Sequence, residues 1–299
     1  MHLTLENIRR GFQRVGYICS EDVILTVYLA LKLEKPLLIE GPPGVGKTEM
    51  GKVLSRVFHT DLIRLQCYEG LDENKALYEW NYQKQLLKIQ IKRESGDGSG
   101  DLEGELFSSE YLLDRPLLKA IQAPEKVVLL IDEVDKSDEE FEAFLFELLS
   151  DFQVSIPELG TVKARQIPMV VLTSNSEREL SDGLKRRCVF LYLDFPTVEK
   201  EIEIIRAKVP GIGERLSAEI AAAVNIIRDN PEIRKKPSIA ETIDWANALV
   251  SLDKDRLAGS TIEHTLNILL KTKSDQNTFN EKMDAEEIVK ESKKKAAAK

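Results

Sequence analysis

Cysteine and histidine are scarce in this sequence, which has three of each among 299 residues. Cys19, Cys67 and Cys188 are odd in number and far apart, so they offer neither a CxxC pair nor a disulfide framework. No histidine lies near a cysteine in the sequence, which argues against a zinc site. This pattern favours a reducing compartment, and we expect a cytoplasmic protein.

Long apolar runs and an excess of positive charge are also missing. The most apolar stretch, Val23 to Leu33, contains Lys32 and is too short to cross a bilayer. The N-terminus lacks the basic start and apolar core of a signal peptide, so we expect none. A net charge of −9 argues against a protein that coats nucleic acid, although a local basic groove stays open. Hydrophobic residues, at 42%, suffice for a core and exclude a wholly disordered chain.

Five short apolar runs are predicted strands, and helical patterns lie between them. The run from Val127 to Ile131 is continuous and rich in β-branched residues, as expected for a strand covered on both faces. Strands that alternate with helices predict a parallel sheet flanked by helices. The predicted strands span residues 36–40, 62–67, 127–131, 168–173 and 189–193, and a β-hairpin is predicted at 154–164.

The pattern becomes helical after residue 196. We therefore expect an α/β domain at 1–196, a smaller helical domain at 197–273 and a polar, flexible tail at 274–299 that is solvated helix or disorder. Residues 76–115 have the character of an insertion with an acidic tip, in which the run 86–91 fits either a strand or a helical turn. Three serine–glutamate pairs predict helix starts with capping boxes: Ser137 with Glu140, Ser238 with Glu241 and Ser260 with Glu263.

The strongest motif runs from Gly41 to Thr48 and matches G-x-x-x-x-G-K-[ST] in full. Its glycines allow backbone N–H groups to turn inward around phosphate oxygens, and the following helix adds the positive end of its dipole. Lys47 would reach the β- and γ-phosphates, and the Thr48 hydroxyl would bind Mg²⁺. A chance glycine loop is disfavoured, because every fixed position and both flanking elements are present.

Acidic and amide residues follow two of the predicted strands. Asp132, at the end of a buried strand, suits Mg²⁺, and Glu133 beside it is placed to polarise an attacking water. The alternative for this pair is a solvated strand end, which the motif at Lys47 and Thr48 argues against. Asn175 would hydrogen-bond the water or the γ-phosphate, although an asparagine at this position is also a common turn residue.

Two arginines, Arg186 and Arg187, precede the last predicted strand. An arginine supplied to the nucleotide of a neighbouring subunit would stabilise charge in the transition state. The alternative is a solvated basic turn. The pattern does not choose between the two arginines.

The segments GPPGVGKT, VVLLIDEVDK, LTSN and LKRRC, in this order and followed by a helical domain, resemble AAA+ ATPases. The run from Leu77 to Leu118 and the stretch from Lys236 to Trp245 are similar to MoxR-type ATPases encoded beside carbon monoxide dehydrogenase. The resemblance implies a P-loop αβα sandwich with a parallel sheet of order 5-1-4-3-2 and a smaller all-α lid. It also implies a Mg²⁺-dependent, chaperone-like ATPase that forms a homo-hexameric ring. Its partners would be a von Willebrand factor A domain protein and a client metalloenzyme.

The resemblance also implies roles for single residues. Lys47 and Thr48 take the Walker A roles, Asp132 and Glu133 those of Walker B, and Asn175 that of sensor 1, with Arg186 or Arg187 as the arginine finger. Where many family members have a Ser-Pro-Arg pattern for sensor 2, this chain has Lys236, Pro237 and Ser238, so sensor 2 is in question. The implied ATP-binding residues are Ile18, Gly41, Pro42, Pro43, Gly44, Val45, Gly46, Lys47, Thr48 and Glu49, with Thr48 and Asp132 as the metal ligands.

Three other functions compete. A helicase-like motor of the helix-2-insert group would need a basic groove, yet the hairpin offers only Lys163 and Arg165. A scaffold that binds nucleotide without turnover conflicts with the intact acidic pair, and a small-molecule kinase would need an acceptor site under a lid within one chain. The insertion tip would repel nucleic acid, since it carries Glu94, Asp97, Asp101, Glu103 and Glu105.

Overall fold

A computed structural model describes residues 3–95, 106–157 and 159–297. The chain divides into two compact units. The first comprises Met1–Val15, Glu21–Glu40 and Lys47–Tyr192, and the second comprises Gly16–Ser20, Gly41–Gly46 and Leu193–Lys299. No described helix is both long and apolar enough to cross a bilayer.

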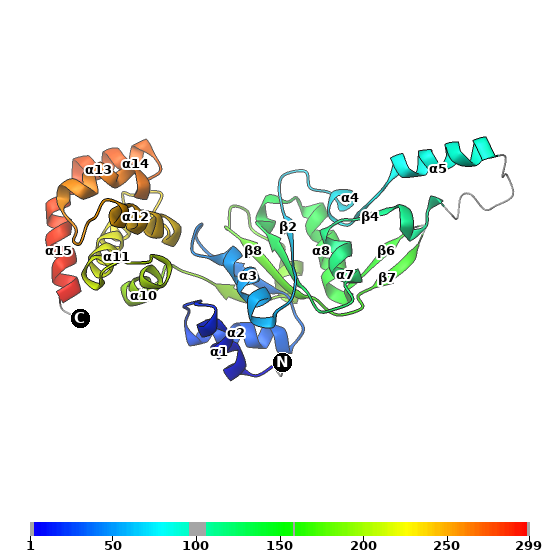
Figure 1. The fold of residues 1–299 in the computed structure, drawn as a ribbon, viewed down its shortest axis with the longest axis horizontal. Coiled ribbons are helices and arrows are strands. Elements are labelled where there is room, and N and C mark those ends of the chain that lie inside the picture. Colours follow the sequence, from blue (N-terminus) through cyan, green and yellow to red (C-terminus); the bar gives the residue numbers. More distant parts are fainter. Residues whose placement is uncertain (1–2, 96–105, 158, 298–299) are drawn as a thin grey trace. The chain divides into compact units, whose positions relative to one another are not determined.

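A five-stranded parallel sheet forms the centre of the first unit (Figure 1). Its strands are β1 (Leu37–Glu40), β2 (Leu62–Gln66), β5 (Val128–Asp132), β8 (Met169–Ser174) and β9 (Val189–Tyr192). They lie in the order β2-β5-β8-β1-β9, and every neighbouring pair is parallel. If these five strands are numbered 1 to 5 along the chain and read from the β9 edge of the sheet, their order is 5-1-4-3-2, as the resemblance implied. All five predicted strands are confirmed.

Helices pack around this sheet because its central strands are apolar on both faces. β5 and β8 are buried along their whole length. A Cβ atom on Gly51 would lie 3.2 Å from the Leu130 side chain, so the missing side chain allows α3 to lie close to β5. The helices of the unit outside the insertion are α1 (Leu5–Arg14), α2 (Glu21–Lys32), α3 (Lys47–Phe58), α7 (Pro116–Gln122), α8 (Glu139–Asp151) and α9 (Asp182–Arg187).

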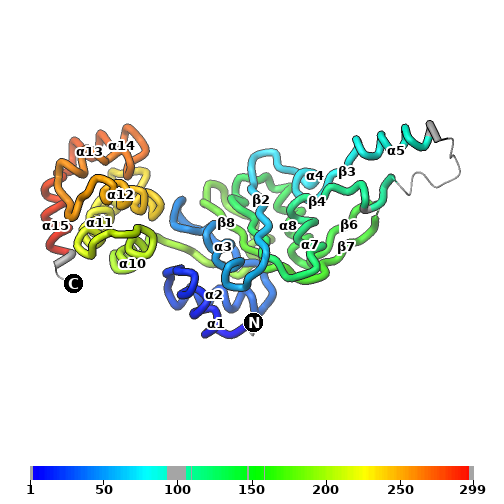
Figure 2. Tube along the Cα trace, in the orientation of Figure 1, coloured from blue at the N-terminus to red at the C-terminus, as the bar shows by residue number. Residues whose placement is uncertain are grey.

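The insertion contains α4 (Glu73–Ala76), β3 (Tyr78–Trp80), α5 (Tyr82–Ser95), the 3-10 helix η1 (Ser109–Tyr111) and β4 (Leu112–Asp114). β3 and β4 pair antiparallel, and α5 extends away from the sheet (Figures 1 and 2). The run 86–91, left open between strand and helix, is helical. Most of the acidic tip, residues 96–105, lies outside the described residues. The predicted hairpin is confirmed as β6 (Gln153–Ile156) and β7 (Gly160–Lys163).

The second unit is helical and has its own apolar core, which includes the fully buried Trp245. The tail from residue 274 was expected as solvated helix or disorder. It is helical, as α14 and α15, but the expected solvation is wrong, because Phe279, Ile288 and Val289 are buried in that core. Its few apolar side chains suffice for packing although most of its residues are polar. The helices are α10 (Val198–Lys208), α11 (Glu214–Asp229), α12 (Ile239–Ser251), α13 (Gly259–Leu269), α14 (Lys273–Lys282) and α15 (Ala285–Ala297).

One of the three predicted capping boxes forms. Ser238 and Glu241 cap α12 reciprocally. The other two predictions are wrong: Asp138, not Ser137, caps α8, and α13 begins after Ala258 with no side-chain cap. Asp138 competes successfully because its carboxylate accepts the N–H of Phe141 at 2.8 Å.

Candidate functional site

The carboxyl ends of parallel strands meet at one edge of a sheet, and the candidate site is built at this edge. β1 leads into the glycine loop, β5 ends at Asp132, and β8 ends at Ser174, just before Asn175. Gly44 and Gly46 adopt positive φ angles of 75° and 97°, which side-chain-bearing residues rarely tolerate. A Cβ atom on Gly46 would meet nothing within 4 Å, so its backbone is open to an approaching group.

Lys47 begins α3 and is 6% exposed. Burial lowers the pKa of its ammonium group, while the nearby carboxylates of Asp135, Asp132 and Glu133 act in the opposite direction. A buried lysine in a field of acids is a strong partner for a phosphate that enters the site.

Asp132 accepts hydrogen bonds from three residues of the site, Thr48, Thr173 and Arg64. Thr48 Oγ1 donates to Asp132 Oδ1 at 2.9 Å, and Thr173 Oγ1 donates to the same oxygen at 2.5 Å. Hydroxyl and carboxylate oxygens are hard donors of the kind that Mg²⁺ binds, so Thr48 and Asp132 could hold this ion. Arg64, from β2, donates to the other carboxylate oxygen of Asp132, with Nε at 3.1 Å.

Glu133 follows directly in a left-handed backbone conformation, with φ 57° and ψ 49°. Such strain in a residue other than glycine concentrates at functional sites. Its Oε2 atom accepts from Gln66 Nε2 at 2.9 Å and from Lys136 Nζ at 2.7 Å. Its backbone N–H donates to Thr173 Oγ1 at 2.9 Å, so Thr173 bridges the two acids. The carboxylate is thus held by two donors.

Asp135 connects the segment after β5 to the segment after β8. Its Oδ2 atom accepts the backbone N–H groups of Asn175 at 3.0 Å and Glu177 at 2.9 Å. Asp135 is buried, and its Oδ1 atom has no hydrogen-bond partner among the described residues. The backbone position of Asn175 is therefore fixed relative to Asp132 and Glu133.

The two arginines of α9 differ in their surroundings. The Arg187 guanidinium lies 3.2 Å from the ring centroid of Phe146, donates to Ser150 Oγ and donates to the Gly183 carbonyl at 3.3 Å. Arg186 is exposed and forms no hydrogen bond or ion pair with a described residue. Arg187 is committed to its own unit, while Arg186 is free to reach outward.

Glu49 and the residues considered for sensor 2 contact side chains outside the acidic cluster. Glu49, on the first turn of α3, pairs with Arg56 at 3.0 Å and Lys52 at 3.7 Å. The backbone N–H groups of Arg234 and Lys235 donate to the Asp275 carboxylate, and Ser238 caps α12. The nucleotide contacts expected of Glu49, Ile18 and Gly41 to Gly46 stay predictions.

Sequence reasoning missed Arg64, Gln66 and Asp135, and it gave Thr173 no role. A signal for the first two was present, since Arg64 and Gln66 are two positions apart and share one face of a strand. β2 pairs with β5, in register Gln66 opposite Asp132, so this polar face adjoins the acids. The pairing of these strands is not readable from their sequences alone.

Comparison with known proteins gives relatives of low identity. An uncharacterized protein of Staphylococcus aureus is 26% identical over 170 residues, which are 54% of this chain and 57% of that protein. An uncharacterized protein of Staphylococcus haemolyticus is 24% identical over 247 residues, 79% of this chain and 84% of that protein. The chain thus spans little more than half the length of the first of these relatives.

Solved structures share the fold. Two mutants of RuvB from Thermotoga maritima superpose with TM-scores of 0.52 and 0.51, at 20% and 19% identity. They cover 87% of this chain and 73% and 72% of the RuvB chains. The family model of the AAA domain, dynein-related subfamily, matches residues 36–188, which include Lys47, Asp132 and Asn175. This match extends over 153 of the 299 residues and over every strand of the main sheet except β9. The chain belongs to the AAA domain family of the dynein-related subfamily.

Proposed function

We propose that this AAA protein is a Mg²⁺-dependent ATPase that acts as a MoxR-type, chaperone-like machine on a partner metalloenzyme in the cytoplasm. The observation that carries the ATPase proposal is the cluster of Thr48, Asp132 and Glu133 beside the buried Lys47. Thr48 donates to Asp132 at 2.9 Å, so a hydroxyl and a carboxylate oxygen that could hold one small hard cation are adjacent.

Each residue of the cluster has a task in this proposal. Thr48 and Asp132 would hold Mg²⁺, which neutralises phosphate charge. Lys47 would bind the β- and γ-phosphates, and Asn175 would orient the attacking water. Glu133 would accept a proton from that water as it attacks. Gln66 and Lys136 hold its Oε2 atom, so Glu133 would accept this proton through Oε1 or after Oε2 is released.

The proposal includes a homo-hexameric ring, with the site completed by an arginine of the neighbouring subunit. Arg186 is the better candidate, because Arg187 is occupied by Phe146, Ser150 and Gly183. We expect Arg186→Ala to lower ATP turnover by a factor of about 10³ or more, and Arg187→Ala to lower it less. Equal losses in the two variants would remove the reason for choosing Arg186.

The ATPase proposal is tested with Glu133→Gln, assayed by phosphate release with ATP and Mg²⁺. Loss of the general base predicts a fall in turnover of about 10²–10⁴-fold, with nucleotide binding retained. Glu139→Gln, on the exposed first turn of α8, is the matched control and keeps normal turnover. Normal turnover in Glu133→Gln would refute the proposed role of this residue.

The partner proposal is tested separately, by affinity capture with Glu133→Gln in the presence of ATP. A variant stalled before hydrolysis retains its client and partner. We expect a von Willebrand factor A domain protein and a metalloenzyme among the retained proteins, and their release when ADP replaces ATP. Retention of neither class would count against the MoxR role but leave the ATPase proposal intact.

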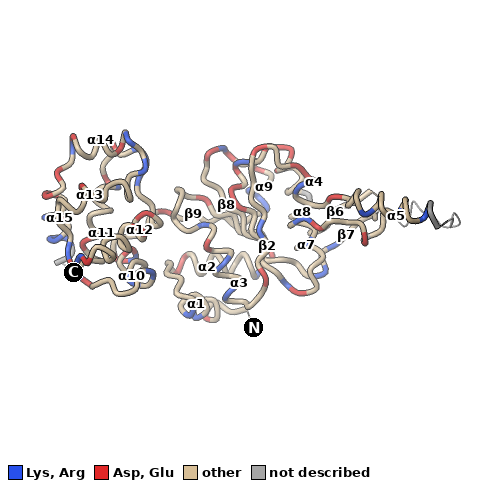
Figure 3. The backbone as a smooth tube through the Cα atoms, turned by 45° about the horizontal axis from the view of Figure 1, so that its top comes forward, with Lys and Arg blue, Asp and Glu red and all other residues tan. Residues whose placement is uncertain are grey.

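The competing function is a nucleic-acid motor. The structural likeness to RuvB is at 20% identity and supports only a common fold. Figure 3 shows acidic and basic residues interspersed along the backbone in the described part of both units. Stimulation of ATP turnover by DNA, together with salt-sensitive DNA binding, would favour the motor.

A further inference from the structure

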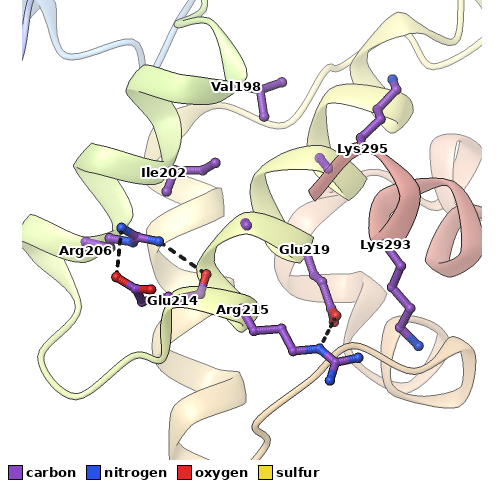
Figure 4. A pocket seen from close by; sticks show the side chains of 10 residues that line it. Val198, Ile202, Arg206, Glu214, Arg215, Glu219, Lys293 and Lys295 are labelled. Atoms are coloured by element: carbon purple, nitrogen blue, oxygen red, sulfur yellow. Dashed lines mark hydrogen bonds and ion pairs between the residues drawn. The ribbon is translucent and has the colours of Figure 1, made fainter. Parts of the chain in front are cut away.

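The second unit contains a pocket of about 730 Å³ among α10, α11 and α15 (Figure 4). This volume falls in the range of ligand sites, about 300–1,000 Å³. Its apolar part comes from Val198 and Ile202 on α10 and from Ala218 and Ala222 on α11. The two alanines are one helical turn apart, so their small side chains leave room beside the larger α10 residues.

The acidic residues of the pocket are already paired within the unit. Glu219 is buried and accepts from Arg215 Nε at 2.8 Å and from the Leu257 N–H at 2.7 Å. Glu214 lies 3.5 Å from the Arg206 guanidinium. Figure 4 shows the contact of Arg215 with Glu219 and that of Arg206 with Glu214. The charges of Glu214 and Glu219 are therefore balanced by two arginines of the same lining.

Two further cations, Lys293 and Lys295, belong to the lining and come from α15. Neither forms an ion pair or hydrogen bond with a residue that the structure describes. The lining thus has four cationic and two acidic side chains, which leaves an excess of two positive charges. The pocket is complementary to a negatively charged ligand with apolar groups.

The arrangement of these charges distinguishes between kinds of anion. In Figure 4 the Lys293 and Lys295 side chains point in different directions, and Val198 and Ile202 lie on α10, apart from both lysines. A compact anion, such as free phosphate, would reach one lysine and leave the apolar surface uncovered. An acidic peptide presents several separated carboxylates together with apolar side chains, and so matches both features.

We propose that this pocket binds a short acidic peptide segment of a partner protein. Apolar side chains of the peptide cover Val198, Ile202 and the two alanines, and its carboxylates pair with Lys293 and Lys295. Every lining residue belongs to the second unit, so the proposal does not depend on the ATPase chemistry.

The test measures binding of a fluorescein-labelled synthetic peptide of glutamate and leucine to the full chain, without nucleotide, by fluorescence anisotropy. Two comparison peptides replace glutamate by glutamine or leucine by serine. We expect the glutamate–leucine peptide to bind, and each comparison peptide to bind at least about tenfold more weakly, because each lacks one of the two complementary features. Equal binding of all three, or no binding, would overturn the proposal.

Variants locate the binding site. Lys293→Glu with Lys295→Glu should weaken binding by about tenfold or more. Lys290→Glu with Lys294→Glu is the matched control, because these exposed lysines lie on the same helix outside the pocket and give the same net charge. Equal weakening by both pairs would mean general electrostatic attraction and would refute the site. Displacement of the peptide by an oligothymidylate of equal charge would instead indicate a nucleic-acid site.

Discussion

At the scale of single residues, the acids after β5 are restrained by neighbours that the sequence did not identify. Asp132 is held by Thr173 and Arg64, and Glu133 by Gln66 and Lys136. These contacts fix the positions of both carboxylates. Under the proposed function, Gln66 and Lys136 restrain Glu133 before it meets the attacking water.

Gln66 offers a direct test of this restraint. Gln66→Ala removes one donor from Glu133, and we expect turnover of ATP to rise by about tenfold or more, because one hydrogen bond to a charged group is worth about 1.5–3 kcal/mol. Phosphate release is measured at saturating ATP, with Gln83→Ala on the exposed surface of α5 as the control. A lower turnover would show that Gln66 positions Glu133 for the reaction instead of restraining it.

Two cysteines are predicted to be unreactive. Burial raises the pKa of Cys67 to about 12, with a further contribution from the carboxylates of Asp132, Asp135 and Glu133. Burial also raises the pKa of Cys188 to about 12. Because the thiolate is the reactive form, both should resist iodoacetamide at neutral pH in the native protein and react after unfolding in urea. Rapid native modification, seen by mass spectrometry of the peptides, would contradict the burial of these thiols.

At the scale of elements, the sequence predicted what local patterns determine. All five sheet strands and the hairpin followed from apolar runs and turn residues, and α3 followed from its apolar stripe. The helical α5 stayed ambiguous because Leu86, Leu87 and Ile91 are exposed, so its apolar residues mark no buried face. The tail was misjudged because α14 and α15 are mostly polar and pack through a few residues such as Phe279.

The residues of the candidate site also divide into those that local motifs predict and those that long-range pairing places. Lys47, Thr48, Asp132 and Glu133 lie in contiguous motifs, so their chemistry is visible in the sequence, and the structure brings them to one edge of the sheet. The contacts of Arg64 and Gln66 depend on which strand adjoins β5, a long-range choice that no local pattern encodes. The sequence left the two arginines equivalent, and the contacts of Arg187 with Phe146, Ser150 and Gly183 distinguish them.

The N-termini of α12, which has a capping box, and of α13, which has no side-chain cap, allow two matched predictions. Ser238→Ala should destabilise the second unit by about 1 kcal/mol, because it removes the capping box of α12. Ser260→Ala should have a smaller effect, below about 0.5 kcal/mol, because α13 has no side-chain cap. Both free energies come from urea unfolding. An equal loss in the two variants would contradict the cap assignment.

At the scale of the whole molecule, each unit has its own core, and each contains one of the two tryptophans. Trp80 lies in β3 of the first unit, and Trp245 lies in α12 of the second. In a Trp80→Phe background, tryptophan fluorescence therefore reports on unfolding of the second unit alone. Unfolding of the two units need not be a single transition.

The core of the second unit contains a buried ion pair. Arg228 donates to both carboxylate oxygens of Glu201, at 2.6 and 2.8 Å, and to the Pro237 carbonyl. Arg228 and Glu201 join α11 to α10, and both are almost fully buried.

Removing one partner leaves the other charge unpaired in the core. We expect Glu201→Leu to destabilise the second unit by about 3–5 kcal/mol, measured through Trp245 in urea. Glu232→Gln, which breaks the exposed pair with Lys282, is the control and should cost below about 1 kcal/mol. A small effect of Glu201→Leu would mean that water reaches Arg228.

The burial of this pair has a consequence for how the protein responds to ionic strength. Mobile ions screen charges that face solvent, such as Arg9 with Glu6 and Glu21, but they do not enter a packed core. The bond between Arg228 and Glu201 should therefore persist in concentrated salt, where exposed pairs weaken. The helical unit thus has an electrostatic contact that keeps its strength in dilute and in concentrated salt solutions.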